Sequence, residues 1–364
     1  MGNKIKKIGI LTGGGDCPGL NAVIRAATRT AILKYGLEVV GFKNGYRGLY
    51  LGQTVKLDMD AISGILPLGG TILYTSNKTN LFKFPFEEDG KTVYRDVSDV
   101  GVKNIEEAGI DAMIIIGGDG TLTSGRDFAR KGVKVVGVPK TIDNDLALTD
   151  VTFGFDTAVS VATEALDRLH TTAESHHRIM CLEVMGRYAG WIALHAGIAG
   201  GADVILIPEI PYDIEKVAEK IVERRRAGKD FSIVVVAEGA KPKSGDVVVS
   251  QVVEDSPDPI RLGGIGQKIA RDLEELVELE TRATILGHLQ RGGKPTAYDR
   301  ILSTRYGKAA VDLIMEGKFG NMVSLRGGKI SYAPLEDVIG QQKNVDPEGE
   351  LVNVARSIGI SFGD

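Results

Sequence analysis

Three carboxylates directly follow two of the apolar, β-branched runs in this sequence. Asp143 and Asp145 lie in PKTIDND (Pro139–Asp145), beside Thr141, and Asp119 follows the run AMIII. In an extended segment Asp143 and Asp145 point the same way, so one could accept a hydroxyl proton while the other supports it or a metal ion. Paired Asp residues are more often turn formers or helix caps. The position of all three after strand-like runs favours catalysis.

Glycine is unusually frequent, at 47 of 364 residues, and it collects at the ends of the apolar runs. Thr12–Asn21 (TGGGDCPGLN) and Gly117–Thr121 (GGDGT) both stand between a strand-like and a helix-like stretch. Backbone N–H groups in such turns suit phosphate. The first turn matches neither GxGxxG nor a Walker A loop. A βα turn that binds no ligand remains an alternative interpretation of it. Asp119 has the chemistry of a Mg²⁺ ligand, because Mg²⁺ takes one or two carboxylates plus phosphate oxygens.

Cationic side chains stand in two further glycine-containing segments. Arg187 lies in MGRYAGW, where we expect a helix to start, and a cation there is unfavourable unless an anion binds beside it. The segment Thr281–Arg300 carries Arg282, His288 and Arg291 among glycines. Arginine forks match phosphate oxygens in pairs, so we predict phosphate binding although a lone His is usually structural. Glu238 ends another strand-like run.

Strand-like runs alternate with amphipathic helical stretches along most of the chain, which indicates parallel sheets covered by helices on both faces. The length suggests two domains, with the change near Asp145–Thr157. Ligands bind beyond the carboxyl ends of such strands. The runs are Lys7–Thr12, Glu38–Phe42, Ala112–Gly118, Lys134–Pro139, Arg178–Gly186, Ala202–Glu209 and Ser232–Gly239.

Composition narrows the functional classes. The 44 basic and 48 acidic residues give a net charge of −4, which argues against a nucleic-acid-binding protein. Only two cysteines, Cys17 and Cys181, are present, and the N-terminus lacks the apolar region of a signal peptide. No run approaches the roughly 18 apolar residues of a membrane span. We therefore expect a cytoplasmic protein.

PKTIDND, MGRYAG and GHLQRGG together resemble the 6-phosphofructokinase family, from about Lys7 to Arg300. The resemblance implies two Rossmann-like domains with the active site in the cleft between them. It implies phosphoryl transfer to the 1-hydroxyl of fructose 6-phosphate with Mg²⁺. The implied donor domain is 1–150 plus about 290–340, and the sugar domain is about 151–289 plus about 341–364.

The resemblance also implies roles for individual residues. Asp143 is similar to the proton acceptor, Thr141 and Asp145 to its neighbours, and Asp119 to the Mg²⁺ ligand. Arg178 and Arg282 match arginines that reach a neighbouring subunit, which implies a homotetramer or at least a dimer. The implied fructose 6-phosphate pocket is Met185, Gly186, Arg187, Glu238, His288 and Arg291. The implied donor side is Gly14, Tyr46, Gly118, Gly120 and Thr121.

Two positions bear on the phosphoryl donor. Gly120 resembles the ATP-dependent members, whereas pyrophosphate-dependent members carry Asp there, which would repel a nucleotide phosphate. Lys140 resembles the pyrophosphate users. The pair resembles a mixed subgroup, and exclusion by charge and size favours ATP. Asn77 and Lys78 stand where well-known bacterial ATP enzymes carry Arg, and Lys78 could replace it as a point charge.

Other interpretations stay open. A pyrophosphate-dependent phosphofructokinase would use the same site, and the GGDG loop also occurs in kinases of NAD or lipids. A non-catalytic regulatory subunit is disfavoured because the three carboxylates are present. Met59, His170 and Asp203 depart from the bacterial effector site, so we expect weak or absent control by ADP and phosphoenolpyruvate. The tail from Lys308 reads as a helix, a turn and a strand without chemistry.

Overall fold

The computed structural model describes residues 5–88, 90–245, 249–252 and 260–364. The chain forms two compact units, each built from segments distant in the sequence. Unit 1 comprises residues up to Thr141, Leu146–Gly154 and Arg291–Gln342; unit 2 comprises Ile142–Asp145, Phe155–Gln290 and Lys343–Asp364. The short segment Ile142–Asp145, which the resemblance assigned to the first domain, thus packs with unit 2.

Unit 1 is built on a seven-stranded sheet of order β15-β14-β7-β6-β1-β2-β3. The five inner strands are parallel, and β15 and β3 pair antiparallel at the two edges. β1, β6 and β7 are buried nearly throughout, as parallel strands covered on both faces must be. The strands are β1 (Lys7–Thr12), β2 (Glu38–Phe42), β3 (Thr54–Lys56), β6 (Ala112–Gly117), β7 (Val135–Pro139), β14 (Asn321–Arg326) and β15 (Lys329–Pro334).

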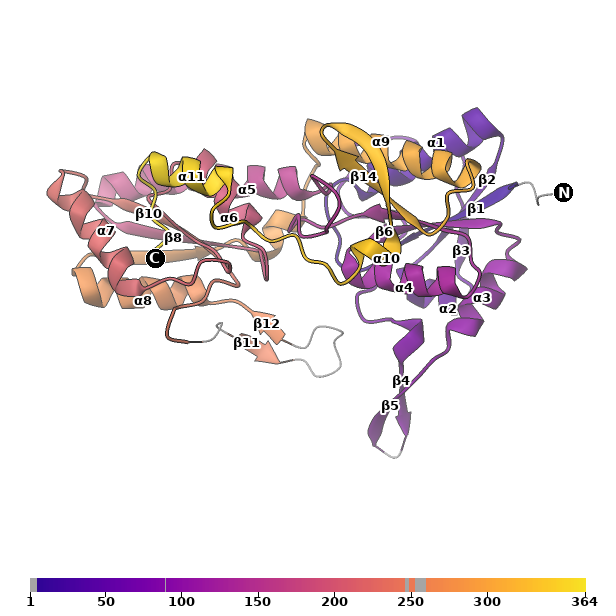
Figure 1. The fold of residues 1–364 in the computed structure, drawn as a ribbon, viewed down its shortest axis with the longest axis horizontal. Coiled ribbons are helices and arrows are strands. Elements are labelled where there is room, and N and C mark those ends of the chain that lie inside the picture. Colours follow the sequence, from indigo (N-terminus) through magenta and orange to yellow (C-terminus); the bar gives the residue numbers. More distant parts are fainter. Residues whose placement is uncertain (1–4, 89, 246–248, 253–259) are drawn as a thin grey trace. The chain divides into compact units, whose positions relative to one another are not determined.

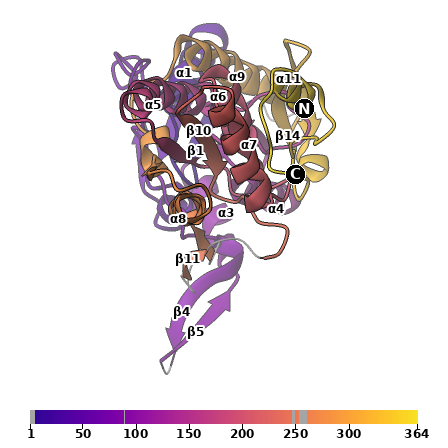
Figure 2. The same cartoon turned by 90° about the vertical axis from the view of Figure 1, so that its left-hand side faces the viewer.

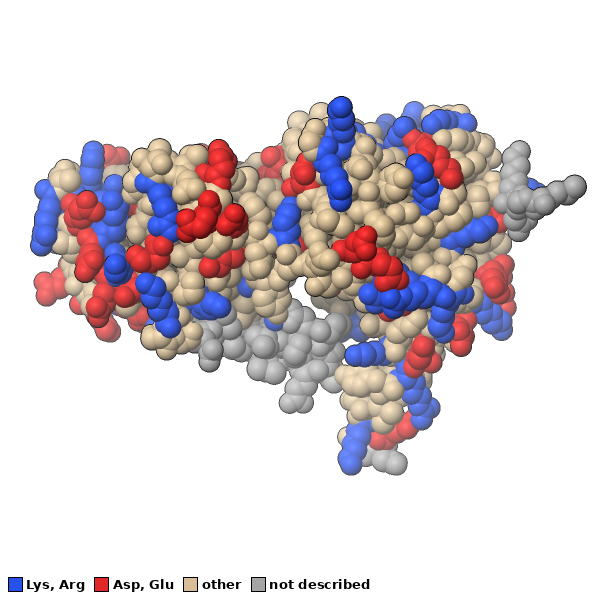
Figure 3. Space-filling model, viewed as in Figure 1, with Lys and Arg blue, Asp and Glu red and all other residues tan. Residues whose placement is uncertain are grey.

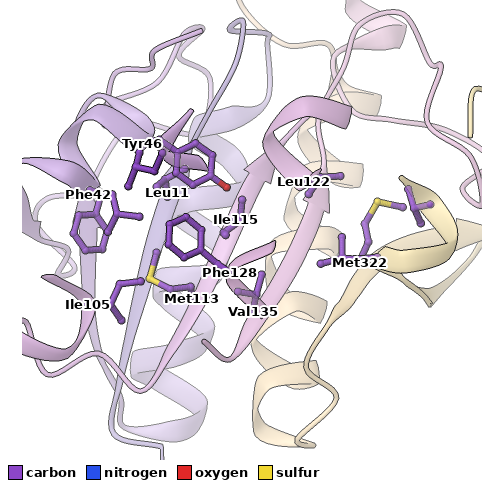
Figure 4. Packing of buried hydrophobic residues seen from close by; sticks show 14 of the residues in the cluster. Leu11, Phe42, Tyr46, Ile105, Met113, Ile115, Leu122, Phe128, Val135 and Met322 are labelled. Atoms are coloured by element: carbon purple, nitrogen blue, oxygen red, sulfur yellow. The ribbon is translucent and has the colours of Figure 1, made fainter. Parts of the chain in front are cut away.

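Helices cover both faces of this sheet (Figure 1). α1 (Leu20–Tyr35) packs beside α9 (Ala297–Met315) on one face. The other face carries α2 (Gly45–Tyr50), α3 (Ser98–Glu107), α4 (Asp119–Arg130) and α10 (Leu335–Val338). Figure 4 shows the core under these last helices, where the Tyr46 ring stacks on Phe128 at 5.9 Å beside Met113 and Ile115.

A two-stranded ribbon projects from unit 1 (Figure 2). Its strands are β4 (Phe84–Glu88) and β5 (Lys91–Arg95), preceded by the short 3₁₀ helix η1 (Leu81–Lys83). Every residue of β5 is exposed, which confirms the exposed excursion expected from the polar sequence near Phe86–Asp96.

Unit 2 holds a four-stranded parallel sheet of order β13-β8-β10-β9. α5, α6 and α11 cover one face, and α7 and α8 cover the other (Figure 1). The strands are β8 (Ile179–Val184), β9 (Val204–Leu206), β10 (Ser232–Ala237) and β13 (Thr281–Ile285). The helices are α5 (Phe155–His176), α6 (Trp191–Ala199), α7 (Ile214–Arg226), α8 (Ile265–Val277), α11 (Glu350–Ser357) and the 3₁₀ helix η2 (Gly287–Arg291). A separate antiparallel ribbon joins β11 (Val249–Val252) and β12 (Ile260–Leu262).

The predicted α/β class with two helix-covered, mostly parallel sheets is confirmed. The tail is richer than predicted, because β14 and β15 extend the sheet of unit 1 and α11 adds to unit 2. Lys and Arg are interspersed with Asp and Glu over the face drawn in Figure 3, as the near-balanced charge suggests. Among the described residues, no helix combines the length and apolarity that a membrane crossing needs.

Candidate active site

The carboxyl ends of β1, β6 and β7 lie side by side in unit 1, and the predicted donor loops follow them. Gly13 N donates to Ile116 O at 2.9 Å, and Lys140 N donates to Gly117 O at 2.9 Å. These backbone bonds continue the strand pairing into the loops. The glycine-rich turn, the GGDG turn and the start of PKTIDND therefore form one continuous edge.

Thr121 explains two of the glycines in this edge. A Cβ on Gly13 would lie 2.7 Å from Thr121 Cγ2, and one on Gly117 would lie 2.2 Å from Thr121 Cβ. Gly14 has φ +76°, a left-handed conformation that favours glycine. Gly14 O accepts from Thr75 Oγ1 at 2.6 Å. The exposed pair that follows shortly, residues 77–78, is thus anchored beside the glycine-rich turn.

Two cations support this turn. Lys140 is 4% exposed, and its ammonium donates to the carbonyl of Gly15. Arg291 belongs to unit 1 and donates from Nη1 to Asp16 O at 3.3 Å. Arg291, predicted for the sugar pocket, therefore contacts the glycine-rich turn. Lys140 thus has a structural partner, the Gly15 carbonyl, that does not depend on a bound phosphoryl donor.

The structure corrects the predicted role of Tyr46. Its ring is 3% exposed, and its hydroxyl donates to Thr121 O at 2.8 Å. Burial raises the pKa of this phenol. Tyr46 therefore supports the GGDG turn from within the core, beside Phe128 (Figure 4). Because the ring is almost fully buried, it does not offer a surface to a ligand.

Asp119 and Gly120 form the first turn of α4 and are exposed. Gly118 directly precedes them, in an extended conformation. Asp119 Oδ1 accepts from Gly340 N at 3.2 Å. Among the described residues, and apart from its chain neighbours and the backbone of α4, no heavy atom lies within 4 Å of a Cβ added to Gly120. Across the part of the chain that the structure describes, no group of three or more His, Cys, Asp or Glu could hold a metal ion. A metal at Asp119 would therefore take its other ligands from phosphate and water.

The sequence predicted an extended loop for the paired carboxylates, but the loop is not extended. Asn144, between Asp143 and Asp145, has φ +53°, and it is 4% exposed. The backbone turns there, so the alternation of a strand does not orient the two half-buried carboxylates. The expectation was wrong because the stretch of β geometry ends at Pro139, the last residue of β7.

The loop after β8 carries Arg187 and is tightly seated in unit 2. Gly186 has φ +130°, and an added Cβ would lie 2.8 Å from Ala189 O. Gly239 N donates to Gly186 O at 3.2 Å, and a Cβ on Gly239 would lie 1.8 Å from Arg187 O. Met185 opens this loop, half-buried. α6 begins at Trp191, so Arg187 precedes the helix and does not lie in its first turn, contrary to the prediction.

The same edge of the sheet gathers two more predicted side chains. Glu238 follows β10, and its N–H donates to Val184 O at 2.9 Å. His288 lies exposed in η2, directly after β13. Since β8, β10 and β13 are neighbouring parallel strands, the Arg187 loop, Glu238 and His288 share one carboxyl edge.

Arg178 and Arg282 lie at the other end of this sheet, at the amino ends of β8 and β13. The length of β8 separates them from the Arg187 loop by roughly 20 Å. Both pair with Glu280: Arg178 Nε lies 2.5 Å from Oε2, and Arg282 contacts Oε1. Arg178 holds the pKa of Glu280 below its ordinary value. The structure therefore does not bring these arginines to the Arg187 loop of their own chain, where the sugar pocket was predicted.

Sequence reasoning missed Glu209 and Lys343, which contact the predicted site loops. Glu209 accepts from Gly190 N at 3.0 Å and Val345 N at 2.8 Å. Burial raises the pKa of this carboxyl. Its place at the end of the run Ala202–Glu209 was an available signal, whereas nothing local distinguished Lys343.

Comparisons with known proteins agree with this geometry. The family model "Phosphofructokinase" matches residues 7–314. The chain is 71% identical to ATP-dependent 6-phosphofructokinase 2 of Clostridium perfringens (strain 13 / Type A), over 100% of both chains. It is 51% identical to a pyrophosphate–fructose 6-phosphate 1-phosphotransferase of Streptomyces coelicolor, over 98% of this chain and 100% of that one.

A solved phosphofructokinase of Saccharomyces cerevisiae superposes with a TM-score of 0.78 at 32% identity. The alignment covers 91% of this chain but 45% of the yeast chain, so the protein spans less than half of that relative. The loops at the carboxyl edges, the family match and these relatives agree, and the chain belongs to the phosphofructokinase family.

Proposed function

We propose that this protein is an ATP-dependent 6-phosphofructokinase of glycolysis. It transfers the γ-phosphoryl group of ATP to the 1-hydroxyl of fructose 6-phosphate, giving fructose 1,6-bisphosphate and ADP. The observation that carries the proposal is that Ile142–Asp145 and the Arg187 loop belong to one compact unit. A proton acceptor and a phosphate-binding cation are thereby available to one sugar phosphate.

Most of the proposed sugar-side residues belong to unit 2, whereas Thr141 and Arg291 belong to unit 1. Asp143 accepts the proton of the attacking 1-hydroxyl, supported by Thr141 and Asp145, and needs only to lie within hydrogen-bond reach of it. Arg187 offsets negative charge on the transferring group. The proposed fructose 6-phosphate ligands are Met185, Gly186, Arg187, Glu238, His288 and Arg291.

The donor side belongs to unit 1. Asp119 would hold Mg²⁺, which would supply positive charge to the donor phosphates. The exposed carboxylate at the start of α4 fits a single protein ligand for such an ion. The remaining proposed donor contacts are Gly14, Asn77, Lys78, Gly118, Gly120 and Thr121.

Pyrophosphate is the second candidate donor, and Lys140 is the residue that favours it. Its ammonium, however, already binds Gly15 O and so has a role without pyrophosphate. Gly120 leaves open space where a carboxylate would oppose a nucleotide. These two observations support ATP.

A coupled assay with fructose 6-phosphate and Mg²⁺, run once with ATP and once with pyrophosphate, tests the proposal. Turnover with ATP and not with pyrophosphate is expected. Turnover with pyrophosphate alone would show that the protein is a pyrophosphate-dependent phosphofructokinase instead. Silence with both would reject phosphofructokinase activity and favour a regulatory subunit.

We further propose a homotetramer in which Arg178 and Arg282 serve a neighbouring subunit's sugar site. Their place at the amino ends of β8 and β13 supports this, because they cannot reach their own. Mixing inactive Arg282→Ser with inactive Asp143→Ser chains should restore about a quarter of the activity, since half of the pairs are hybrid and each holds one intact site. No recovery, with hybrids confirmed by mass, would reject the shared site.

A further inference from the structure

The segment Lys343–Val345, where the chain re-enters unit 2, contacts the loop with the paired carboxylates. Lys343 N donates to Asp145 O at 2.9 Å, and Lys343 Nζ donates to Asn144 Oδ1 at 2.9 Å. One residue of the tail thus holds both residues that follow Asp143, through its backbone and its side chain.

Asn144 is the position in this loop that depends most on its surroundings. Its left-handed φ of +53° is uncommon for a residue other than glycine, although Asn tolerates it better than most. Its side chain is buried, so the amide oxygen must find a donor within the protein. Lys343 supplies that donor.

The same segment also contacts the end of the Arg187 loop. Trp191 Nε1 donates to Lys343 O at 2.8 Å, and Lys343 Nζ lies 5.7 Å from the Trp191 ring centroid. Two residues along, Val345 N shares the Glu209 carboxylate with Gly190 N. A Cβ on Gly190 would lie 2.4 Å from Ile207 Cβ, so this end of the loop is closely packed.

We propose that Lys343 is a positioning residue that sets the Asp143 loop against the Arg187 loop, with Glu209 securing the second contact. It acts through Asn144, Asp145 and Trp191. The inference rests on the proposed function, because its importance lies in holding the proton acceptor and the phosphate-binding arginine at a spacing matched to one sugar phosphate. Transfer is sensitive to misplacement of about 1 Å, which can lower the rate by about 10²-fold.

Lys343→Met tests this by removing the ammonium while keeping most of the aliphatic stem. We expect kcat to fall by about 10- to 100-fold, with KM for fructose 6-phosphate changing by less than about threefold. Lys343→Arg, which keeps the charge, should recover part of kcat. Lys216→Met, on the exposed face of α7, is the matched control and should behave as wild type.

Asn144→Gly tests the same bond from the other side and keeps the left-handed conformation accessible. The kcat of the double variant Lys343→Met/Asn144→Gly should be no lower than that of the more impaired single variant. Both single changes remove the same hydrogen bond, between Lys343 and Asn144. If the two losses multiply, the bond is not the cause. Asn144→Gly also decides the matter should Lys343→Met fail to fold.

Hydrogen exchange of the residues around 141–146 gives a readout that needs no turnover. Lys343→Met should exchange faster there than wild type, whereas Lys216→Met should not. Wild-type kcat and wild-type exchange in Lys343→Met would overturn the positioning role. If wild type were inactive with both donors but exchange still rose in Lys343→Met, the proposed function would fail while the contact stood.

Discussion

Gly120→Asp places one carboxylate at the start of α4, where the fold has room for it. Outside the backbone of α4 and the two chain neighbours, the part of the chain that the structure describes places no heavy atom within 4 Å of an added Cβ, and the position is exposed. An acidic residue in the first helical turn is favourable by about 0.3–1 kcal/mol, and replacing glycine in a helix gains about 0.5–1 kcal/mol. We therefore expect the melting temperature to stay the same or rise.

The added carboxylate should instead weaken the use of ATP, because it repels the nucleotide phosphates. A carboxylate about 5 Å from a phosphate charge is repelled by about 3 kcal/mol at an effective dielectric constant of about 20. That corresponds to roughly 10²-fold in kcat/KM for ATP, and screening at an exposed site reduces it toward about tenfold. Pyrophosphate has no α-phosphate esterified to a nucleoside, so its use should suffer less.

Steady-state kinetics with each donor, together with thermal melts, measure this effect. Gly120→Ala is the matched control, because it adds the Cβ without the charge and should keep kcat/KM for ATP within about twofold. An unchanged kcat/KM for ATP in Gly120→Asp would refute the reasoning. An equal loss in Gly120→Ala would show that size, and not charge, governs the position.

Three further outcomes are expected. Asp143→Ser should lower turnover by about 10²- to 10⁴-fold with modest change in fructose 6-phosphate binding, and an unchanged rate would contradict its role as proton acceptor. Burial lowers the pKa of His195 below its ordinary value of 6.5, so the folded chain binds fewer protons than the unfolded one, and stability is lost as pH falls through that lowered pKa. His195→Gln should therefore shrink the drop in melting temperature between about pH 7.5 and pH 5, and a drop equal to that of wild type would exclude His195 as the cause. His170 contacts Gly200 O at 2.7 Å and Asp203 pairs with Arg224 at 2.8 Å, so saturation by fructose 6-phosphate should be hyperbolic and insensitive to ADP, and a sigmoid response relieved by ADP would contradict this.

The fold class, and the sheet edges at which the candidate residues lie, could be predicted because they depend on local patterns. Buried parallel strands read as short β-branched runs, and a chain that enters a parallel sheet repeatedly must place every following loop at the same edge. That topology put the GGDG turn beside the glycine-rich turn, and Glu238 and His288 beside the Arg187 loop, as their positions after strand-like runs suggested.

Other features depended on contacts that no local pattern encodes. Tyr46 follows a strand like the predicted ligands, yet packing against Phe128 buries it. Lys343 and Asn144 are 199 positions apart in the sequence, so their hydrogen bond has no local signal. The residues next to Asn144 do not by themselves specify its left-handed backbone conformation. Residue types and their order along the chain were thus enough to predict the fold class and the sheet edges at which the candidate residues lie. Which side chains face a ligand and which hold its loops was decided by burial and long-range hydrogen bonds, because these arise only once both units have packed.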